Sequence, residues 1–500
     1  MSEPVIHDLS APGRCGVTLP GLDVPAADPL PAAFLRGGLD LPEVSEVDVV
    51  RHYVRLSQLN YAVDLGMYPL GSCTMKYNPK VNEVAARLPG LAETHPLQPE
   101  YQVQGNLCLM HELQGMLAEI GGFEAVSLQP AAGAQGEFAG VLMIRAYHRE
   151  HADAQRDLML IPDSAHGTNP ATTAMAGYQA VELRSDARGN VDLGDLRSHL
   201  SDRVAGMMLT NPNTLGLFDE HVVEVCRLVH EAGGLMYGDG ANLNALMGVV
   251  KPAELGFDVM HFNLHKTFAT PHGGGGPGAG PVGAGPLLAS YLPGPVVTAE
   301  ECVLDAATGA RWYDDWVDEQ CVRGYWYTLT MPERSIGRVK AFYGNYGVLV
   351  RAYTYIRTLG ASGLREATEV AVLNANYLQS LLKGVYPLAY DRPCMHECVI
   401  QGSVAGAPGI RALDIAKRLI DYGVHPPTNY FPLIVPEALM IEPTETESKA
   451  SVDAYAEIML RIAREAREEP ELLHEAPTRA PVRRMDEVQA ARNLVLRWQE

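Results

Sequence analysis

The chain of 500 residues lacks the features that would place it in a membrane, on nucleic acid or outside the cell. No stretch reaches the roughly 20 apolar residues that span a bilayer. Lys and Arg number 39 against 60 Asp and Glu, a formal charge of −21, and this acidic balance without basic runs disfavours nucleic acid and anionic membranes. Residues 1–8 lack the basic start and apolar core of a signal peptide. These absences predict a soluble cytoplasmic protein.

The eight cysteines are scattered along the chain, as expected for reduced thiols in the cytosol. The only tight cluster is Cys394-Met395-His396-Glu397-Cys398. Its three-residue gap is compatible with zinc, but no second pair of ligands lies nearby in the sequence. A strand that contains two thiols is the better interpretation, and the sequence predicts no metal site.

The composition and the pattern of apolar residues divide the chain into three parts. Residues 1–100 are rich in Pro, Gly and polar turns, with one helical stretch over 47–59, and are expected to form an arm or extension. Residues 101–330 alternate helical segments with short apolar runs, which is typical of a mostly parallel sheet with helices on both faces. Residues 331–500 are more helical, with short strands, and predict a smaller α+β domain.

The strongest chemical signal in the large domain is a pair formed by Lys266 and Asp239. Each follows a short apolar run, and in parallel sheets ligands gather where strands end. Many α/β enzymes hold pyridoxal phosphate with such a pair, because the lysine forms a Schiff base and the acid keeps the pyridine nitrogen protonated. The alternatives are a surface lysine and an acidic helix cap. The small residues Gly238, Gly240 and Ala241 around the acid favour a flat ring packed there.

Two further segments have the composition of a cofactor site. Gly133-Ala134-Gln135-Gly136 lies between a predicted strand and a predicted helix, where free N–H groups bind anions, although an ordinary tight turn explains it equally well. His166 follows the run 158–162, and its flat imidazole could stack on a pyridine ring. A histidine with only ordinary polar partners remains the alternative.

The glycine run 273–276, together with Gly278, matches the letters of the dinucleotide-binding pattern Gly-x-Gly-x-x-Gly but not its structural context. Pro277 interrupts the pattern and no helix follows it, because glycines and a proline continue to residue 285. No Gly-Lys-Ser/Thr sequence is present either, which excludes a P-loop. The glycines are expected to let the backbone pass close to a cofactor or a neighbouring subunit.

The segment Tyr68 to Pro79 is dense in small polar residues yet lies far from the predicted sheet in the sequence. A structured turn is the simplest interpretation. So many hydroxyl and amide groups would also suit a loop that reaches into an active site, possibly across a subunit boundary.

Taken together, these segments resemble the pyridoxal-phosphate subunit of glycine decarboxylase, the P-protein of the glycine cleavage system, known as subunit 2 in the split bacterial form. The resemblance extends from about Gly16 to Glu475. The segments that carry it are Tyr68 to Pro79, Thr94 to Pro96, Gln129 to Gly136, Ser164 to Thr168, Tyr237 to Asn242, Asn263 to Gly280 and Met440 to Glu447.

This resemblance implies a fold-type I pyridoxal-phosphate enzyme with a sheet of about seven strands. It assigns Lys266 to the Schiff base, His166 to ring stacking and Asp239 to the pyridine nitrogen. The remaining expected cofactor-binding residues are Gly133, Ala134 and Gln135 at the phosphate, with Ala241, Asn263 and His265 around the ring.

The resemblance also implies the reaction and the partners. The expected function is decarboxylation of glycine with transfer of the aminomethyl group to the lipoyl group of H-protein, an oxidoreductase activity. Family members in one chain are about twice this length, so a separate subunit 1 and an α2β2 heterotetramer are expected.

The substrate contacts are expected to be neutral, because tight binding of the departing carboxylate would be lost in the transition state. Thr94, His95 and Asn429 are the predicted substrate-binding residues. The alternative functions are another fold-type I reaction, such as amino-acid decarboxylation or transamination, and a non-catalytic scaffold subunit.

Overall fold

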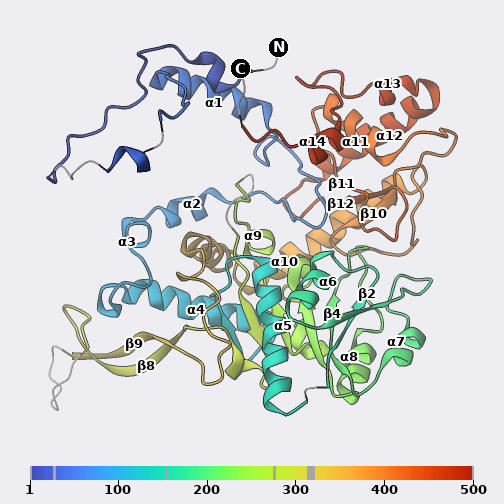
Figure 1. The fold of residues 1–500 in the computed structure, drawn as a ribbon. Coiled ribbons are helices and arrows are strands. Elements are labelled where there is room, and N and C mark those ends of the chain that lie inside the picture. Colours follow the sequence, from blue (N-terminus) through green and yellow to red (C-terminus); the bar gives the residue numbers. More distant parts are fainter. Residues whose placement is uncertain are drawn as a thin grey trace.

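The computed structural model describes residues 3–25, 30–35, 37–153, 155–273, 278–311 and 321–497. Most of the glycine run, including Gly274 to Gly276, and the interrupting Pro277 lie outside these residues. Figure 1 shows a large α/β body, a smaller C-terminal unit beside one end of it, and an N-terminal segment that extends away from both.

The large body is built on a seven-stranded sheet with the strand order β1-β7-β6-β5-β4-β2-β3. Only β7 runs against its two neighbours, so the other six strands point the same way and the predicted mostly parallel sheet is confirmed. The strands are β1 (Ala125–Ser127), β2 (Leu158–Pro162), β3 (Gln179–Leu183), β4 (Val204–Thr210), β5 (Leu235–Asp239), β6 (Val259–His261) and β7 (Val282–Ala284).

Side chains on neighbouring positions of a strand enter different hydrophobic clusters. On β5, Met236 packs into the cluster that contains Phe262, whereas Leu235 and Tyr237 pack into a second cluster with Ile144 of α5 (Gly133–Glu150). Alternate side chains of a strand point to opposite faces, so both faces of the sheet are buried, as continuous apolar strands require. The other helices of this body are α4 (Gln104–Gly121), α6 (Thr168–Met175), α7 (Leu193–His199), α8 (Val222–Glu231) and α9 (Leu264–Thr267).

The C-terminal unit is joined to the body by α10 (Tyr346–Leu382), a long helix with one non-helical residue, Gly360. The unit contains a three-stranded antiparallel sheet, β10-β12-β11, with helices packed against it. Its elements are β10 (Cys398–Gln401), β11 (Thr428–Asn429), β12 (Ala438–Ile441), α11 (Ala412–Asp421), α12 (Lys449–Glu468), α13 (Glu471–His474) and α14 (Glu487–Arg492).

Two extensions leave the body (Figure 1). An antiparallel ribbon of β8 (Val296–Asp305) and β9 (Cys321–Thr330) projects from it and was not expected from the sequence. The N-terminal arm contains α1 (Glu46–Leu59), close to its predicted bounds, followed by the short helices α2 (Lys80–Ala86) and α3 (Pro89–Ala92). Before α1, the arm carries exposed apolar side chains, among them Leu19, Leu22, Phe34 and Leu41. No helix in the described ranges is both long and apolar enough to cross a membrane.

Candidate active site

A cavity of about 290 Å³ opens where β2, β4, β5 and β6 end. In an open sheet this edge is the usual place for a ligand. Eight of the predicted cofactor residues line the cavity: Gly133, Ala134, His166, Asp239, Ala241, Asn263, His265 and Lys266. Residues that the sequence analysis did not assign also line it: Ser72, Ala132, Glu137, Thr168, Thr210, Thr214, Asn242 and His261.

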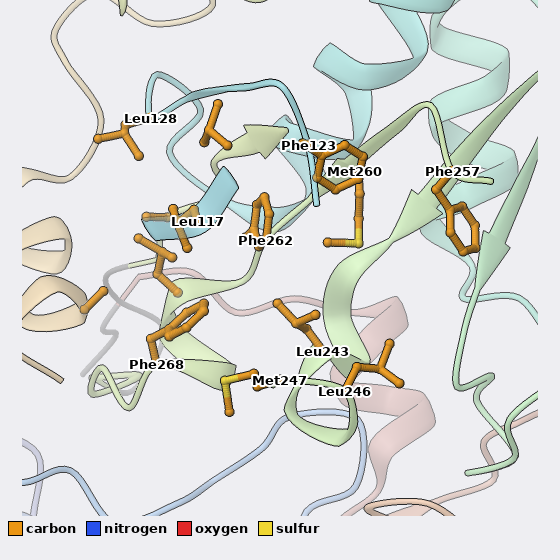
Figure 2. Close-up of a cluster of buried hydrophobic side chains, with 14 of the residues drawn as sticks. Leu117, Phe123, Leu128, Leu243, Leu246, Met247, Phe257, Met260, Phe262 and Phe268 are labelled. Atoms are coloured by element: carbon orange, nitrogen blue, oxygen red, sulfur yellow. The ribbon is translucent and has the colours of Figure 1, made fainter. Parts of the chain in front are cut away.

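Lys266 stands on a short, firmly anchored helix. The segment Asn263 to Thr267 is flanked by Phe262 and Phe268, whose side chains are fully buried in the main core. In Figure 2 these two rings lie among Leu117, Phe123, Met247 and other apolar residues. Since both flanking rings are fixed in the core, the lysine between them is held at the cavity wall.

Asp239, at the end of β5, is buried and ionised. Its Oδ1 accepts the N–H of Ala241 at 3.0 Å and its Oδ2 accepts Asn169 Nδ2 at 3.4 Å. Burial raises the pKa of this carboxyl, but His261, the Ala241 N–H and Lys266 outweigh burial, and the pKa lies below its usual value. A buried carboxylate that stays charged is suited to pair with a protonated ring nitrogen.

Glu137 is a second buried acid beside Asp239 that sequence reasoning missed. Its Oε2 accepts Thr168 Oγ1 at 2.9 Å and its Oε1 accepts Asn169 Nδ2 at 3.0 Å. Burial and the charge of Asp239 raise the pKa of Glu137. It was missed because an acid inside a helix usually lies on the surface, and only its two hydrogen-bond partners on α6 show otherwise.

His166 is held at its position by the residue two places on. Its Nδ1 lies 2.9 Å from Thr168 Oγ1 and 3.2 Å from the backbone N of the same residue. Burial lowers the pKa of His166, so the imidazole is neutral near pH 7. A neutral, fixed ring at the cavity wall suits stacking against a flat heteroaromatic ligand.

The first turn of α5 lies at the cavity wall without a capping side chain. The N-cap residue Ala132 makes no side-chain hydrogen bond to the helix, so the N–H groups at Gly133 and Ala134 lack a capping side chain. Gln135 does not line the cavity. Its side chain accepts Ala131 N at 2.6 Å and donates to the Val339 carbonyl at 2.7 Å, so it braces the turn, and only its backbone N–H can serve the predicted phosphate role.

The cavity therefore contains a matching group for each part of pyridoxal phosphate. Lys266 has the amine for an aldehyde, Asp239 the buried carboxylate for a pyridine nitrogen, and the α5 turn the uncapped N–H groups for a phosphate. Asn263 Nδ2 and His261 Nε2, which both line the cavity, are joined by a hydrogen bond of 2.9 Å. The residues present fit this cofactor.

Gly133 is required by the space around it. A Cβ built at this position would lie 2.2 Å from Oδ1 of Asn263, so Gly133→Ala must displace the turn or the amide. We expect about a tenfold or greater loss of pyridoxal-phosphate affinity, measured by fluorescence titration. Gly167→Ala is the matched control, since a Cβ there meets nothing within 4 Å and the backbone φ is −59°. Equal loss in both variants would contradict this role of Gly133.

His265 and His272 are neutral in the folded protein at unusually low pH. Burial first, and then the charge of Lys266, lowers the pKa of His265 to about 3 and that of His272 to about 4. In the unfolded chain both titrate near 6.5, so between pH 6.5 and about 4 the unfolded state binds more protons than the folded state. The unfolding free energy therefore decreases as the pH is lowered through this window.

We expect the unfolding free energy of the cofactor-free protein to fall by up to about 1.4 kcal/mol per pH unit for each of these two histidines in that window. Urea unfolding at pH 7, 6 and 5 measures this slope. His272→Asn is expected to flatten it, whereas the exposed His95→Asn is expected to leave it unchanged. An unchanged slope in His272→Asn would contradict this prediction, because it would mean that the imidazole binds its proton as readily in the folded state as in the unfolded chain.

The loop at residues 71–76 closes one side of the cavity and is held by the C-terminal unit. Ser72, which lines the cavity, donates its backbone N–H to Glu397 Oε2 at 2.8 Å, and Thr74 N donates to Glu442 Oε2 at 2.9 Å. Ser72 and Thr74 have φ values of 65° and 46°, a left-handed backbone that non-glycine residues rarely adopt. The predicted entry of this loop into the active site thus occurs within one chain.

Lys76, at the end of the same loop, holds it through its side chain. Its Nζ is buried and lies 2.7 Å from Glu445 Oε1, 2.9 Å from Asn244 Oδ1 and 3.2 Å from Tyr355 Oη. The ion pair raises the pKa of Lys76 against the opposing effect of burial. One ammonium thereby joins the arm, the segment after β5, α10 and the C-terminal unit.

The three predicted substrate residues are not brought to this cavity. Thr94 Oγ1 donates to the Gly90 carbonyl at 2.9 Å, and His95 is exposed, with Nδ1 accepting Leu97 N at 3.1 Å. Asn429 pairs with Leu439 in the small sheet. None of the three lines the cavity, where Thr210, Thr214 and Asn242 offer neutral groups in their place.

Two family models match parts of the chain. The model described as glycine dehydrogenase, C-terminal domain, matches residues 367–478, and that of aminotransferase class-V matches residues 137–275. The second range contains Asp239 and Lys266.

Curated relatives match nearly the full length. A probable glycine dehydrogenase (decarboxylating) subunit 2 of Caldanaerobacter subterraneus subsp. tengcongensis is 57% identical over 498 residues, covering 99% of this chain and 98% of that protein. A protein of the same description from Halalkalibacterium halodurans is 54% identical and covers 100% of this chain and 98% of its own length.

Among solved structures, an inhibitor-bound glycine decarboxylase (P-protein) of the glycine cleavage system superposes with a TM-score of 0.70 at 21% identity, over 87% of this chain and 93% of that one. A sphingosine-1-phosphate lyase of Burkholderia pseudomallei gives 0.61 at 12% identity, over 90% and 95%. At these identities the structures support the fold, which is shared with the predicted fold-type I class.

Proposed function

The chain belongs to the glycine dehydrogenase (decarboxylating) subunit 2 family, and from this membership we propose that it decarboxylates glycine with pyridoxal phosphate and passes the aminomethyl group to lipoyl H-protein. The observation that carries the proposal is the meeting of Lys266, Asp239 and the α5 turn in one cavity. Bound there, the cofactor supplies an electron-accepting ring to which glycine is joined through its amine.

Three residues of the cavity have separate roles toward that ring. Asp239, which is ionised, would hold the pyridine nitrogen in its protonated form. His166, neutral and fixed by Thr168, would stack on the ring. Lys266 would hold the cofactor through its amine, and Nζ is a group that could take up or return a proton.

The cavity wall also suits loss of the substrate carboxylate. Among the described residues that line it there is no arginine, and the neutral hydroxyl of Thr210, which has no hydrogen-bond partner among the described residues, is available instead. A strong ion pair to the carboxylate would stabilise the substrate and not the transition state in which CO2 departs, so a neutral donor such as the Thr210 hydroxyl favours decarboxylation. This supports a decarboxylase over a transaminase.

The relatives of this chain are named as subunit 2, which supports a partner subunit 1 as part of the proposal. The exposed apolar residues of the arm, such as Leu22 and Phe34, support a partner that covers them. We propose an α2β2 assembly in the cytoplasm that receives the lipoyl arm of H-protein. Its composition can be measured by mass photometry of the two subunits mixed.

The decisive experiment measures exchange of labelled bicarbonate into glycine, with subunit 1 and either lipoate or H-protein present. Exchange that depends on this chain and on pyridoxal phosphate is the expected result. A chain that binds the cofactor, with its visible absorbance, yet gives no exchange would point to another fold-type I reaction. A chain without that absorbance would point to a scaffold subunit.

A further inference from the structure

Behind the loop at residues 71–76, three fully buried side chains present polar atoms without partners. In the described part of the chain, no hydrogen bond reaches Nδ1 or Nε2 of His396, Oε1 of Glu397 or Oε1 of Glu442. All three residues have 0% exposure. A buried polar group left unpaired costs about 1 to 3 kcal/mol, so three such residues in one place point to a missing partner.

The three side chains converge on one point. One ligand atom from each lies within 4.8 Å of the others, and His396 Nε2 is 3.9 Å from Glu442 Oε1. This separation is too long for a hydrogen bond. Two ligands that each lie about 2.1 Å from one metal ion can be up to about 4.2 Å apart, so 3.9 Å is compatible with a shared ion. Ligand atoms that are farther apart than this, up to 4.8 Å, would need a small side-chain movement to reach the same ion.

The hydrogen bonds on the other side of the carboxylates favour a cation over protons. Glu397 Oε2 and Glu442 Oε2 each accept a backbone N–H of the loop, and such bonds stabilise the ionised form. Two buried carboxylates then repel each other unless a positive charge lies between them. A proton on either Oε1 would itself need an acceptor within hydrogen-bonding distance, and the described residues offer none. The nearby Lys76 is already paired with Glu445.

We propose that His396, Glu397 and Glu442 bind one divalent first-row transition-metal ion, with Zn²⁺ as the reference ion. One imidazole nitrogen and two carboxylate oxygens suit Zn²⁺, Mn²⁺ or Fe²⁺, whereas Mg²⁺ and Ca²⁺ prefer oxygen alone. The ion neutralises both acids and pairs three of the four unpartnered atoms. It also fixes the carboxylates that hold Ser72 and Thr74, so its role is to position the loop at the cavity.

This site gives a different meaning to the cluster Cys394 to Cys398. In the sequence, its two thiols are compatible with zinc but have no second pair of ligands nearby. The structure turns His396 and Glu397, between the thiols, toward Glu442, which lies more than 40 positions further along the chain. The ligand set is therefore assembled from residues just before β10 and just after β12, two strands that pair at that end through Cys398 and Ile441, so no local motif in the sequence reveals it.

The test uses the full chain with pyridoxal phosphate bound, stripped of metal by dialysis against a chelator and then supplied with ZnCl2 or CoCl2. We expect about one ion per chain by elemental analysis, a rise in Tm with Zn²⁺, and visible d–d bands with Co²⁺ without thiolate charge transfer. His396→Asn is expected to abolish all three. His148→Asn, which changes another buried histidine that bonds the Ala205 carbonyl, is expected to retain them.

Three outcomes would overturn the proposal. The first is wild-type protein that retains well under one ion per chain and shows no Tm response, which would leave a buried water or a shared proton in the gap. The second is metal binding that persists in His396→Asn. The third is a Co²⁺ spectrum dominated by thiolate. If His396→Asn does not fold, Glu442→Gln and the wild-type titration decide. The metal site does not depend on the proposed function, because none of these measurements uses turnover.

Discussion

Replacing Lys266 with Ala is expected to reduce glycine–bicarbonate exchange by about 10⁴-fold or more and to abolish the visible absorbance of the lysine-bound cofactor. The side chain lines the cavity, whereas the rings of Phe262 and Phe268, which flank its helix in the sequence, supply the core packing, so its loss removes the amine without removing core packing. Absorbance scans and exchange assays on the purified chain with subunit 1 measure both effects. Thermal unfolding of the cofactor-free variant is expected to match that of the parent chain.

Two further variants distinguish the chemical role of the Lys266 amine from the effect of its positive charge. Lys266→Arg retains a cation but cannot form a Schiff base, so we expect it to be as inactive as the alanine variant. Lys251→Ala removes a lysine that pairs with exposed Glu119, and it is expected to leave absorbance and exchange unchanged. Substantial exchange in Lys266→Arg would show that only the charge matters, and the assignment of the Schiff base would be wrong.

Asp239→Asn is expected to lower kcat by about 10²- to 10³-fold, with a smaller effect on cofactor affinity. The amide has the size of the carboxyl and can still accept the N–H of Ala241, so the end of β5 keeps its geometry. What is lost is the buried negative charge that keeps a ring nitrogen protonated. The pH dependence of the cofactor spectrum, compared with that of the parent chain, reports this loss directly.

The control for this change is Asp157→Asn, which alters an exposed acid that is paired with Arg203 on the surface. We expect it to leave kcat and the spectrum unchanged. A variant at Asp239 that retains more than about one tenth of the parent kcat would mean that the carboxylate does not face the ring nitrogen. Glu137 would then be the next acid to replace, since it lies in the same wall.

The sequence predicted the strand ends well because their signals are local. Each run of apolar residues that ends in a polar one marks the edge of a parallel sheet, and the bounds of β2 and β5 follow from this pattern. Lys266 and Asp239 were placed correctly at one cavity for the same reason. By contrast, β7 has three residues and runs antiparallel, so it has too little pattern to be recognised.

The contribution of the C-terminal unit to the site was beyond local reasoning. The hydrogen bond from Ser72 to Glu397 joins residues 325 positions apart, and that from Thr74 to Glu442 joins residues 368 apart. Acidic residues that follow or precede short strands are usually solvated, so their burial against a distant loop cannot be read from composition. The same holds for Lys76, whose partners come from three other parts of the chain.

The way in which the loop at residues 71–76 is held has a consequence for how the protein is made. During translation the loop leaves the ribosome first, and the 368 residues that separate Thr74 from Glu442 follow at about 5 to 20 residues per second, which takes roughly 20 to 70 s. Until then the left-handed backbone at Thr74 has no carboxylate to hold it. Cofactor capture is therefore a late step of biosynthesis, and chains truncated before β12 are expected to leave the ribosome unable to complete the site.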